Sequence, residues 1–204
     1  FDAADVRANA ERIGRLLRDF HLTMPHHVAG AGFMFWVFHV IRDYARTLRS
    51  GGSRMADRLP AWLELSGRLE AAQKPLPIVF GHNDLLPANF LDDGDRLWLI
   101  DFEYAGFSTA MFDIAGAASN AEMNHDQAAT LLETALGSPA DTAISRAFHA
   151  MQCASLLRET MWSLVSELYL DAPGADYETY TAENLTRLDA ALDQYHSTYG
   201  KTSS

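Results

Sequence analysis

Helical patterning on both sides of one short β-type segment is the feature that most constrains the fold of this chain. Apolar residues recur at helical spacing through residues 2–72 and again through residues 112–196. Between them, the run Ile78-Val79-Phe80 is followed by two more β-type runs, which the turn sequence Asp92-Asp93-Gly94-Asp95 connects. The pattern predicts an α+β fold that is predominantly helical and carries a small β-hairpin.

The expected elements leave the polar residues concentrated in one place. Helices are expected over 2–21, 33–48, 59–72, 112–120, 126–136, 141–169 and 177–195, and strands over 78–80, 89–91 and 97–100. Polar and charged residues gather between positions 82 and 104. A helical scaffold with its ionisable groups on one hairpin is typical of a site built on loops.

The composition excludes several classes of function. The 204 residues carry a net charge of −11, which argues against a nucleic-acid partner and against an anionic membrane surface. Apolar runs such as Gly32–Val40 are shorter than the ~20 residues that a membrane span needs. The lone Cys153 excludes an internal disulfide framework and a cysteine-based zinc site, and it favours a cytoplasmic location.

A His-x-Asp-x4-Asn motif carries the chemistry. His82, Asp84 and Asn89 form it, and Asp101 follows after a short apolar run, as in the catalytic segments of protein kinases. Phosphoryl transfer needs an oriented hydroxyl group and cations on the phosphate more than covalent help. We therefore interpret Asp84 as the base, and Asn89 and Asp101 as oxygen ligands for Mg²⁺. Within this catalytic set, we expect His82 to fix the loop by a hydrogen bond.

Each of these residues taken alone has an ordinary explanation. Asp and Asn are common turn residues, and a single histidine is more often packed than catalytic. A structural Ca²⁺ or Mg²⁺ on Asn89 and Asp101 is a further alternative, although acids at regular spacing are few. The two motifs in the right order favour the catalytic interpretation.

The segment from His82 to Asn89, followed by Leu99-Ile100-Asp101-Phe102-Glu103-Tyr104, resembles the choline/ethanolamine kinase branch of the aminoglycoside-phosphotransferase-like kinases. Phe112-Asp113-Ile114-Ala115 is similar to the stretch that follows in that family, which implies that Asp113 braces the catalytic loop. The resemblance implies a small-molecule kinase that uses ATP and Mg²⁺. Its acceptor would be the hydroxyl of choline, ethanolamine or a similar amino alcohol.

The resemblance also implies a domain organisation. Residues 1–204 would form the C-terminal lobe of the protein-kinase-like fold, with helices over 2–72, the catalytic loop and metal hairpin over 78–104, and helices over 112–196. No Gly-rich strand–turn–strand precedes the first expected helix, and neither Lys74 nor Lys201 lies upstream on a strand. We therefore expect the N-terminal ATP lobe to be absent from this chain, and the chain alone to be inactive or nearly so.

Four residues are expected at the acceptor: Tyr104, Glu103, Glu159 and Trp162. A quaternary ammonium group binds to aromatic faces with carboxylates nearby. The resemblance places Tyr104 and Trp162 in the pocket, and Glu159 shares a helix face with Trp162 because the two are three residues apart. Trp162 is equally explained as a core residue, and Glu103 as either an orienter of metal-bound water or a solvated acid.

Two other functions stay open at this point. One keeps the fold but transfers phosphate to an aminoglycoside or another sugar hydroxyl, and the other is a non-catalytic kinase-like binding module. The intact set of Asp84, Asn89 and Asp101 argues against the module, since a protein without catalysis needs no such set. The sequence carries no signal for an oligomeric state.

Overall fold

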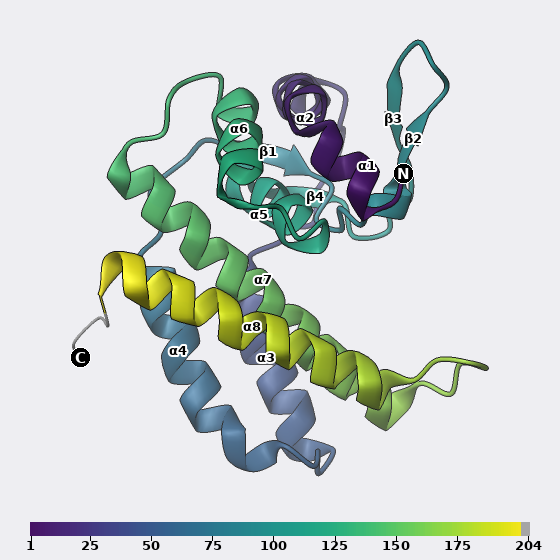
Figure 1. Ribbon diagram of the computed structural model, residues 1–204. Coiled ribbons are helices and arrows are strands. Elements are labelled where there is room, and N and C mark those ends of the chain that lie inside the picture. Colours follow the sequence, from purple (N-terminus) through teal and green to yellow (C-terminus); the bar gives the residue numbers. More distant parts are fainter. Residues whose placement is uncertain (201–204) are drawn as a thin grey trace. The chain divides into compact units, whose positions relative to one another are not determined.

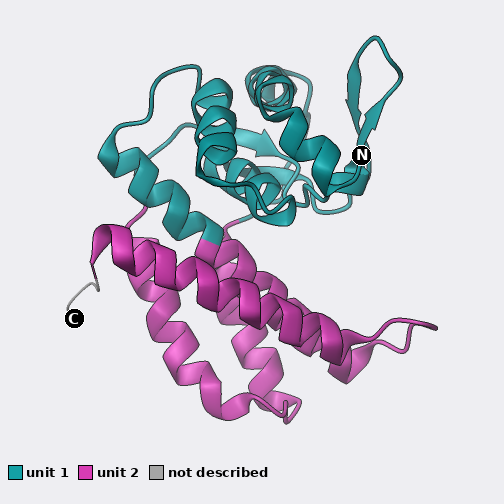
Figure 2. Ribbon diagram, viewed as in Figure 1, with its two compact units in different colours: residues 1–35, 74–152 teal, residues 36–73, 153–204 magenta. Residues whose placement is uncertain are grey.

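The computed structural model describes residues 1–200 (Figure 1), so residues 201–204, the end of the expected domain, lie outside the described residues. The chain forms two compact units, shown in different colours in Figure 2. Unit 1 comprises residues 1–35 and 74–152, and unit 2 comprises residues 36–73 and the chain from residue 153 onward. The chain therefore passes between the units three times, the last time within the long helix α7, Thr142–Tyr169.

Unit 1 holds all the strands of residues 1–200. Its helices are α1 Ala3–Ala8, α2 Ala10–Thr23, the 3-10 turn η1 Met24–His26, the 3-10 turn η3 Pro87–Asn89, α5 Ala110–Asn120 and α6 His125–Leu136, together with the first part of α7. Its strands are β1 Ile78–Gly81, β2 Phe90–Asp92, β3 Leu97–Leu99 and β4 Gly106–Thr109. They form two antiparallel pairs, β1 with β4 and β2 with β3.

The core of unit 1 lies where α2, α5 and α6 pack together beside β1. Its fully buried side chains include Val6, Ile13, Leu17, Phe90, Met111, Ile114 and Leu131. In the strand pairs, Gly81 lies opposite Gly106 and Phe90 lies opposite Leu99. This packing fixes the end of β1 and the start of β2, the two ends of the predicted catalytic loop.

Unit 2 is helical in its described residues. It consists of α3 Val37–Ser50, the 3-10 turn η2 Ala56–Arg58, α4 Leu59–Ala71, the second part of α7 and α8 Tyr177–Tyr199. Helices α7 and α8 share a buried hydrogen bond of 2.7 Å between Ser163 Oγ and Thr181 Oγ1. The turn after α3 is joined to α7 because Arg54 donates to both carboxylate oxygens of Glu167, at 2.8 and 2.9 Å.

The single cysteine lies inside unit 2. Cys153 is buried in α7, and this burial raises the pKa of its thiol to about 12. Because the thiolate is the reactive form, both the burial of Cys153 and the raised pKa disfavour reactions of its thiol. By length and apolarity, no helix within residues 1–200 qualifies as a membrane-spanning segment.

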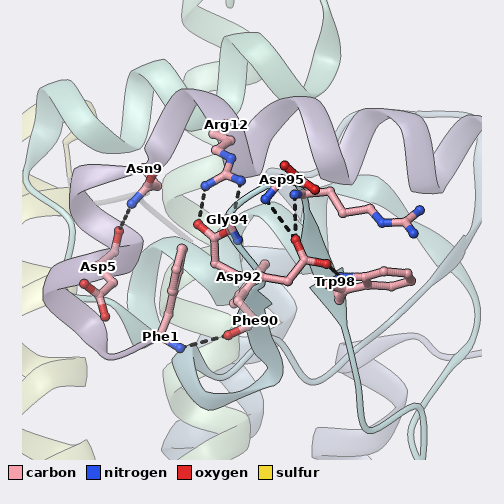
Figure 3. Close-up of polar contacts among 11 residues, drawn as sticks. Phe1, Asp5, Asn9, Arg12, Phe90, Asp92, Gly94, Asp95 and Trp98 are labelled. Atoms are coloured by element: carbon pink, nitrogen blue, oxygen red, sulfur yellow. Dashed lines mark hydrogen bonds and ion pairs between the residues drawn. The ribbon is translucent and has the colours of Figure 1, made fainter.

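The expected helix over 2–21 is in fact two helices. Asn9 has φ −112° and ψ 23°, outside the helical region, and it ends α1 before α2 begins. Its side-chain Nδ2 donates to the Asp5 carbonyl at 2.9 Å, a contact drawn in Figure 3. The Asp5 carbonyl also accepts from Asn9 N–H at 3.1 Å, so the backbone and the side chain of Asn9 together close the end of α1.

The expected helix over 33–48 begins four residues later, at Val37. Residues 33–35 are extended because they pair with β4, a strand that the sequence did not suggest. Phe107 N–H donates to the Phe33 carbonyl at 2.7 Å, and Phe35 N–H donates to the Phe107 carbonyl at 2.8 Å. The α+β, predominantly helical fold class and the hairpin are confirmed.

Two glycine positions test this packing in opposite directions. A Cβ on Gly81 would press against Ser108 Oγ and lie 2.9 Å from Asn83 Oδ1, whereas a Cβ on Gly67, inside α4, would meet nothing within 4 Å. We expect Gly81→Ala to lower the free energy of unfolding by about 1–3 kcal/mol through overpacking. Gly67→Ala is expected to raise it by about 0.5–1 kcal/mol, because alanine favours helix. Urea unfolding measures both, and equal effects at the two positions would contradict the described packing.

Candidate active site

The backbone of the loop after β1 is fixed by one buried carboxylate. Asp113 lies on α5 and is buried. Its Oδ2 accepts from His82 N–H at 2.8 Å, and its Oδ1 accepts from Asn83 N–H at 2.7 Å. The His21 ring lies 2.7 Å from the same Oδ2 through Nε2, which therefore carries the proton, because a carboxylate only accepts. Three donors thus converge on Asp113 and hold the loop to α5 and α2.

Asn83 links this loop to the segment that follows Asp101. Its φ of 64° is left-handed, a conformation that asparagine tolerates better than most residues. Its buried Nδ2 lies within hydrogen-bond distance of three carbonyl oxygens, those of Gly81 (3.3 Å), Tyr104 (3.0 Å) and Gly106 (3.4 Å). Sequence reasoning passed over Asn83 and His21; a signal for Asn83 was its place between the two motif residues His82 and Asp84.

His82 lies completely inside unit 1. Its Nε2 donates to the Ile100 carbonyl at 2.8 Å, and its ring centroid lies 4.8 Å from that of Phe102. These contacts attach the loop to the residues on either side of Asp101. A histidine without solvent access, whose ring proton is used by a backbone carbonyl, positions the loop and is badly placed to carry protons.

Asn89 connects the chain segments that carry Asp84 and Asp101. Its Nδ2 donates to the backbone carbonyl of Asp84 at 2.9 Å, and its own carbonyl accepts from Ile100 N–H at 3.1 Å. Asp84 is half-buried, and Asp101, the next residue after Ile100, is exposed. Asp101 has φ 65°, a left-handed conformation that is uncommon outside glycine and recurs at functional positions. The structure therefore brings together the chain segments that carry Asp84, Asn89 and Asp101.

The oxygen atoms of Asn89 and Asp101 suit Mg²⁺, and they do not form a metal centre in which the protein supplies every ligand. Within residues 1–200, no group of three or more His, Cys, Asp or Glu side chains is arranged to hold a metal ion. Because Asn89 Nδ2 is used by Asp84, the amide is oriented and Oδ1 is its atom for a cation. One amide oxygen and one carboxylate suit Mg²⁺, which keeps waters and takes phosphate oxygens as further ligands. A structural Ca²⁺ takes 6–8 oxygen ligands, more than the side chains of Asn89 and Asp101 alone supply.

An open apolar cavity of about 660 Å³ lies on the β2–β3 hairpin, with Leu91, Trp98 and Ile100 among its lining residues. Trp98 is fixed because its Nε1 donates to Asp93 Oδ2 at 2.7 Å (Figure 3), and the Arg96 guanidinium lies 3.8 Å from the centre of its ring. Hydrogen bonds, first from Arg96 N–H and then from Trp98, lower the pKa of Asp93 to about 2. The cavity is large enough for a small-molecule ligand.

The hairpin that carries this cavity is attached to α2. Both terminal nitrogens of Arg12 reach the carboxylate of Asp92 (Figure 3), and the hydrogen bond from Arg12 lowers the pKa of Asp92. The backbone nitrogen of Phe1 lies 2.8 Å from the Phe90 carbonyl oxygen. The N-terminal helices therefore hold β2 and the cavity in a defined position within unit 1.

Two of the four residues expected at the acceptor belong to unit 2, where they meet two tyrosines. The Trp162 ring makes edge contacts with Tyr177 and Tyr180 of α8, with centroid distances of 6.1 and 6.2 Å. Glu159 is buried, pairs with Arg158 and accepts from Tyr180 Oη at 3.2 Å. Burial, followed by the charge of Glu159, raises the pKa of Tyr180. Sequence reasoning missed both tyrosines, because helical spacing along α8 does not show which residues face α7.

The other two expected residues belong to unit 1. Tyr104 is half-buried, and its carbonyl accepts from Asn83 Nδ2 as described above. Glu103 is exposed. Tyr104 and Glu103 therefore lie beside the segment of Asp101, whereas Glu159 and Trp162 belong to the helical unit.

Comparisons with known proteins agree on one family. The profile of the phosphotransferase enzyme family, APH, matches residues 1–149. LicA of Haemophilus influenzae is 36% identical over 107 residues, which are 50% of this chain and 30% of that protein. A probable ethanolamine kinase of Arabidopsis thaliana is 47% identical over 53 residues, which are 25% of this chain and 13% of that protein. The chain thus spans well under half the length of the curated relatives that it matches.

Solved structures share the fold over almost the whole chain. A choline/ethanolamine kinase family protein of Mesorhizobium loti superimposes with a TM-score of 0.80 and 25% identity, over 94% of this chain and 66% of its own. The choline kinase LicA of Streptococcus pneumoniae gives a TM-score of 0.72 at 20% identity, over 95% of this chain and 66% of its own. Spectinomycin phosphotransferase has the same fold, with a TM-score of 0.57 at 12% identity, over 90% of this chain and 65% of its own.

Asp113 offers a direct test of how the loop is held. In Asp113→Asn, one of the two carboxylate oxygens becomes an NH₂ group that faces an N–H donor, so buried donors lose their acceptor. We expect the free energy of unfolding to fall by about 1–3 kcal/mol. The matched control is Asp189→Asn, the same change at an exposed helical position of α8, which should alter stability by less than about 0.5 kcal/mol. Equal stabilities of the two variants would remove Asp113 from its supporting role.

Proposed function

The chain belongs to the phosphotransferase enzyme family, and from that membership we propose that the protein transfers the γ-phosphate of ATP to an amino alcohol such as choline or ethanolamine. The observation that carries the proposal is the pair of hydrogen bonds by which Asn89 joins the segments of Asp84 and Asp101. The chain spans about two thirds of the kinase structures that it resembles, so the activity is proposed for the whole protein.

Within this proposal, Asp84 orients the acceptor hydroxyl and takes its proton. Phosphoryl transfer depends mainly on positioning and on charge neutralisation, and one well-placed carboxylate is the part that protein kinases use for the hydroxyl. Asn89 Oδ1 and the Asp101 carboxylate would hold Mg²⁺, which neutralises charge on the phosphates when it is bound. Asp113 and His82 are proposed as positioning residues, since each bonds to backbone and is buried.

The cavity on the hairpin is proposed to receive the purine ring of ATP. Leu91, Trp98 and Ile100 are each exposed by 40–45%, although they are large apolar side chains. They lie beside Asn89 and Asp101 in the chain, so a nucleotide on this surface would have its phosphates near the proposed metal ligands. A LicA structure of the same fold was determined in complex with AMP, which supports a nucleotide for this family.

The amino alcohol is proposed to bind through the aromatic cluster of unit 2. Trp162, Tyr177 and Tyr180 offer three aromatic rings, and aromatic faces attract quaternary ammonium groups. Because Glu159 is already paired with Arg158, its carboxylate adds less attraction than an unpaired acid would. We therefore propose that the aromatic rings contribute more than Glu159 to binding the ammonium group. Tyr104 and Glu103, near Asp101, are proposed as further contacts of the amino alcohol.

We also propose that residues 1–204 alone transfer little phosphate. The kinase structures of this fold extend over a further third of their own length. ATP bound to the hairpin alone would have its purine ring on an open surface. Activity measurements are therefore proposed for the full-length protein.

The central test is Asp84→Asn in the full-length protein. We expect ADP release driven by choline or ethanolamine to fall at least about 100-fold, since a positioned general base contributes 10²–10⁴-fold. Asp95→Asn, the same change at an exposed turn residue, should keep wild-type turnover. Undiminished turnover by Asp84→Asn would remove Asp84 as the base. ADP release driven by an aminoglycoside and not by choline or ethanolamine would show that the acceptor is an aminoglycoside. A failure to bind ATP at all would favour a non-catalytic binding module.

Trp162 tests the recognition of the acceptor. We expect Trp162→Ala to raise KM for choline by about 3- to 30-fold, the value of one cation–π contact, while Trp162→Phe raises it less. Choline and its neutral analogue 3,3-dimethylbutan-1-ol are compared, since the analogue has the same shape without the charge. The variant should lose most of the preference for choline over the analogue. If both substrates lose affinity equally, Trp162 is a packing residue of unit 2.

A further inference from the structure

We propose that the groove between α3 and α4 in unit 2 binds a small phosphate-bearing anion, such as a phosphate monoester. The groove has a volume of about 340 Å³, and its lining residues include Arg42, Arg46, Arg49, Leu63, Ser66 and Gly67. None of these residues takes part in the phosphoryl transfer proposed above, so this proposal does not depend on it.

Three arginines on one helix face give the groove its charge. Arg42, Arg46 and Arg49 follow one another at spacings of four and three residues, which places them on the same side of α3. Like charges at this spacing destabilise a helix unless other groups compensate them. The chain as a whole has a net charge of −11, so a concentration of arginine on one face runs against its overall composition.

The acids nearby compensate two of the three arginines. Arg42 donates to Glu70 Oε2 at 2.7 Å, and Arg46 donates to Asp43 Oδ1 at 2.8 Å. Among residues 1–200, the guanidinium group of Arg49 has neither a hydrogen-bond partner nor an ion-pair partner. These ion pairs are largely exposed, and exposed pairs are weak, so an anion with two or more oxygens can compete for the guanidinium groups.

A buried hydroxyl on the facing helix is the second, independent observation. Ser66 lies on α4, is only 1% exposed and lines the groove, yet its Oγ has no hydrogen-bond partner in the described residues. A buried hydroxyl normally finds a partner, and a helical serine can bond the carbonyl four residues earlier. The next residue, Gly67, has open space where a Cβ would lie. The groove therefore combines an unused donor with room for a ligand.

The chemistry of the lining selects the class of ligand. Guanidinium groups bind phosphate in a bidentate manner, and a serine hydroxyl donates one further hydrogen bond to a phosphate oxygen. Leu63 and the bare backbone at Gly67 offer a small apolar surface for the rest of an ester. Inorganic phosphate alone would fill only part of the volume, and this favours an ester over the free ion.

The test uses inorganic phosphate and phenyl phosphate as probes, followed by NMR of the arginine Nε–H groups and of the backbone of α3 and α4. At constant ionic strength, we expect saturable shifts confined to these residues, with phenyl phosphate binding more tightly than phosphate. The double variant Arg46→Gln/Arg49→Gln should weaken binding at least about tenfold, since each guanidinium–phosphate bond is charge-assisted. Ser66→Ala should weaken it about two- to fivefold.

The control is Arg15→Gln/Arg68→Gln, which removes two arginines that pair with acids on their own helices and do not line the groove. This variant should retain wild-type affinity. Three results would overturn the proposal: equal losses of phosphate affinity in both double variants, equal chemical-shift changes with chloride, or no chemical-shift change at about 20 mM phenyl phosphate, well above a Kd of about 1 mM. The kinase assay separates the two proposals, because Arg46→Gln/Arg49→Gln should leave basal ADP release unchanged whether or not the anion site exists.

Discussion

The buried carboxylate of Asp113 is the interaction on which the candidate active site depends. It accepts from two successive backbone N–H groups of the loop and from the ring of His21 on α2, so one side chain on α5 satisfies three donors from two other parts of unit 1. The bonds to two adjacent residues fix both the position and the direction of the chain. His82 and Asn83 then extend the same network to the residues around Asp101. The network is buried, and the residues proposed for chemistry lie at its edge. The residues that hold the loop are therefore different from the residues that are proposed to react.

The residues proposed for phosphoryl transfer and those proposed for acceptor binding belong to different units. Unit 1 contributes Asp84, Asn89, Asp101 and the apolar cavity of the hairpin, and unit 2 contributes the aromatic cluster around Trp162. Each unit is stabilised by its own buried contacts, the helices α2, α5 and α6 in the first and the helix pair α7 and α8 in the second.

The sequence predicted local patterns better than pairings. The helices with a clear apolar face and the hairpin with its turn residues were found because their signals lie within a few neighbouring residues. Strand β4 was missed because its four residues become a strand only through pairing with β1 and with residues 33–35. Tyr177 and Tyr180 were missed for a related reason, since their contact with Trp162 depends on how α8 packs on α7. The motif residues were identified because their spacing is local, whereas His21 supports them through Asp113, which is 92 residues away from it in the chain.

The three crossings of the chain between the units impose an order on synthesis. Unit 1 has all its residues once position 152 has left the ribosome, whereas α3 and α4 are made early and belong to a unit that is completed only after residue 153. These two helices must therefore wait, with their apolar faces uncovered, while the 79 residues of the other unit between Gln73 and Cys153 are translated. At translation rates of ~5–20 residues per second, this delay lasts several seconds. The helical unit is thus the part of the protein whose first two helices wait longest for their partners during synthesis.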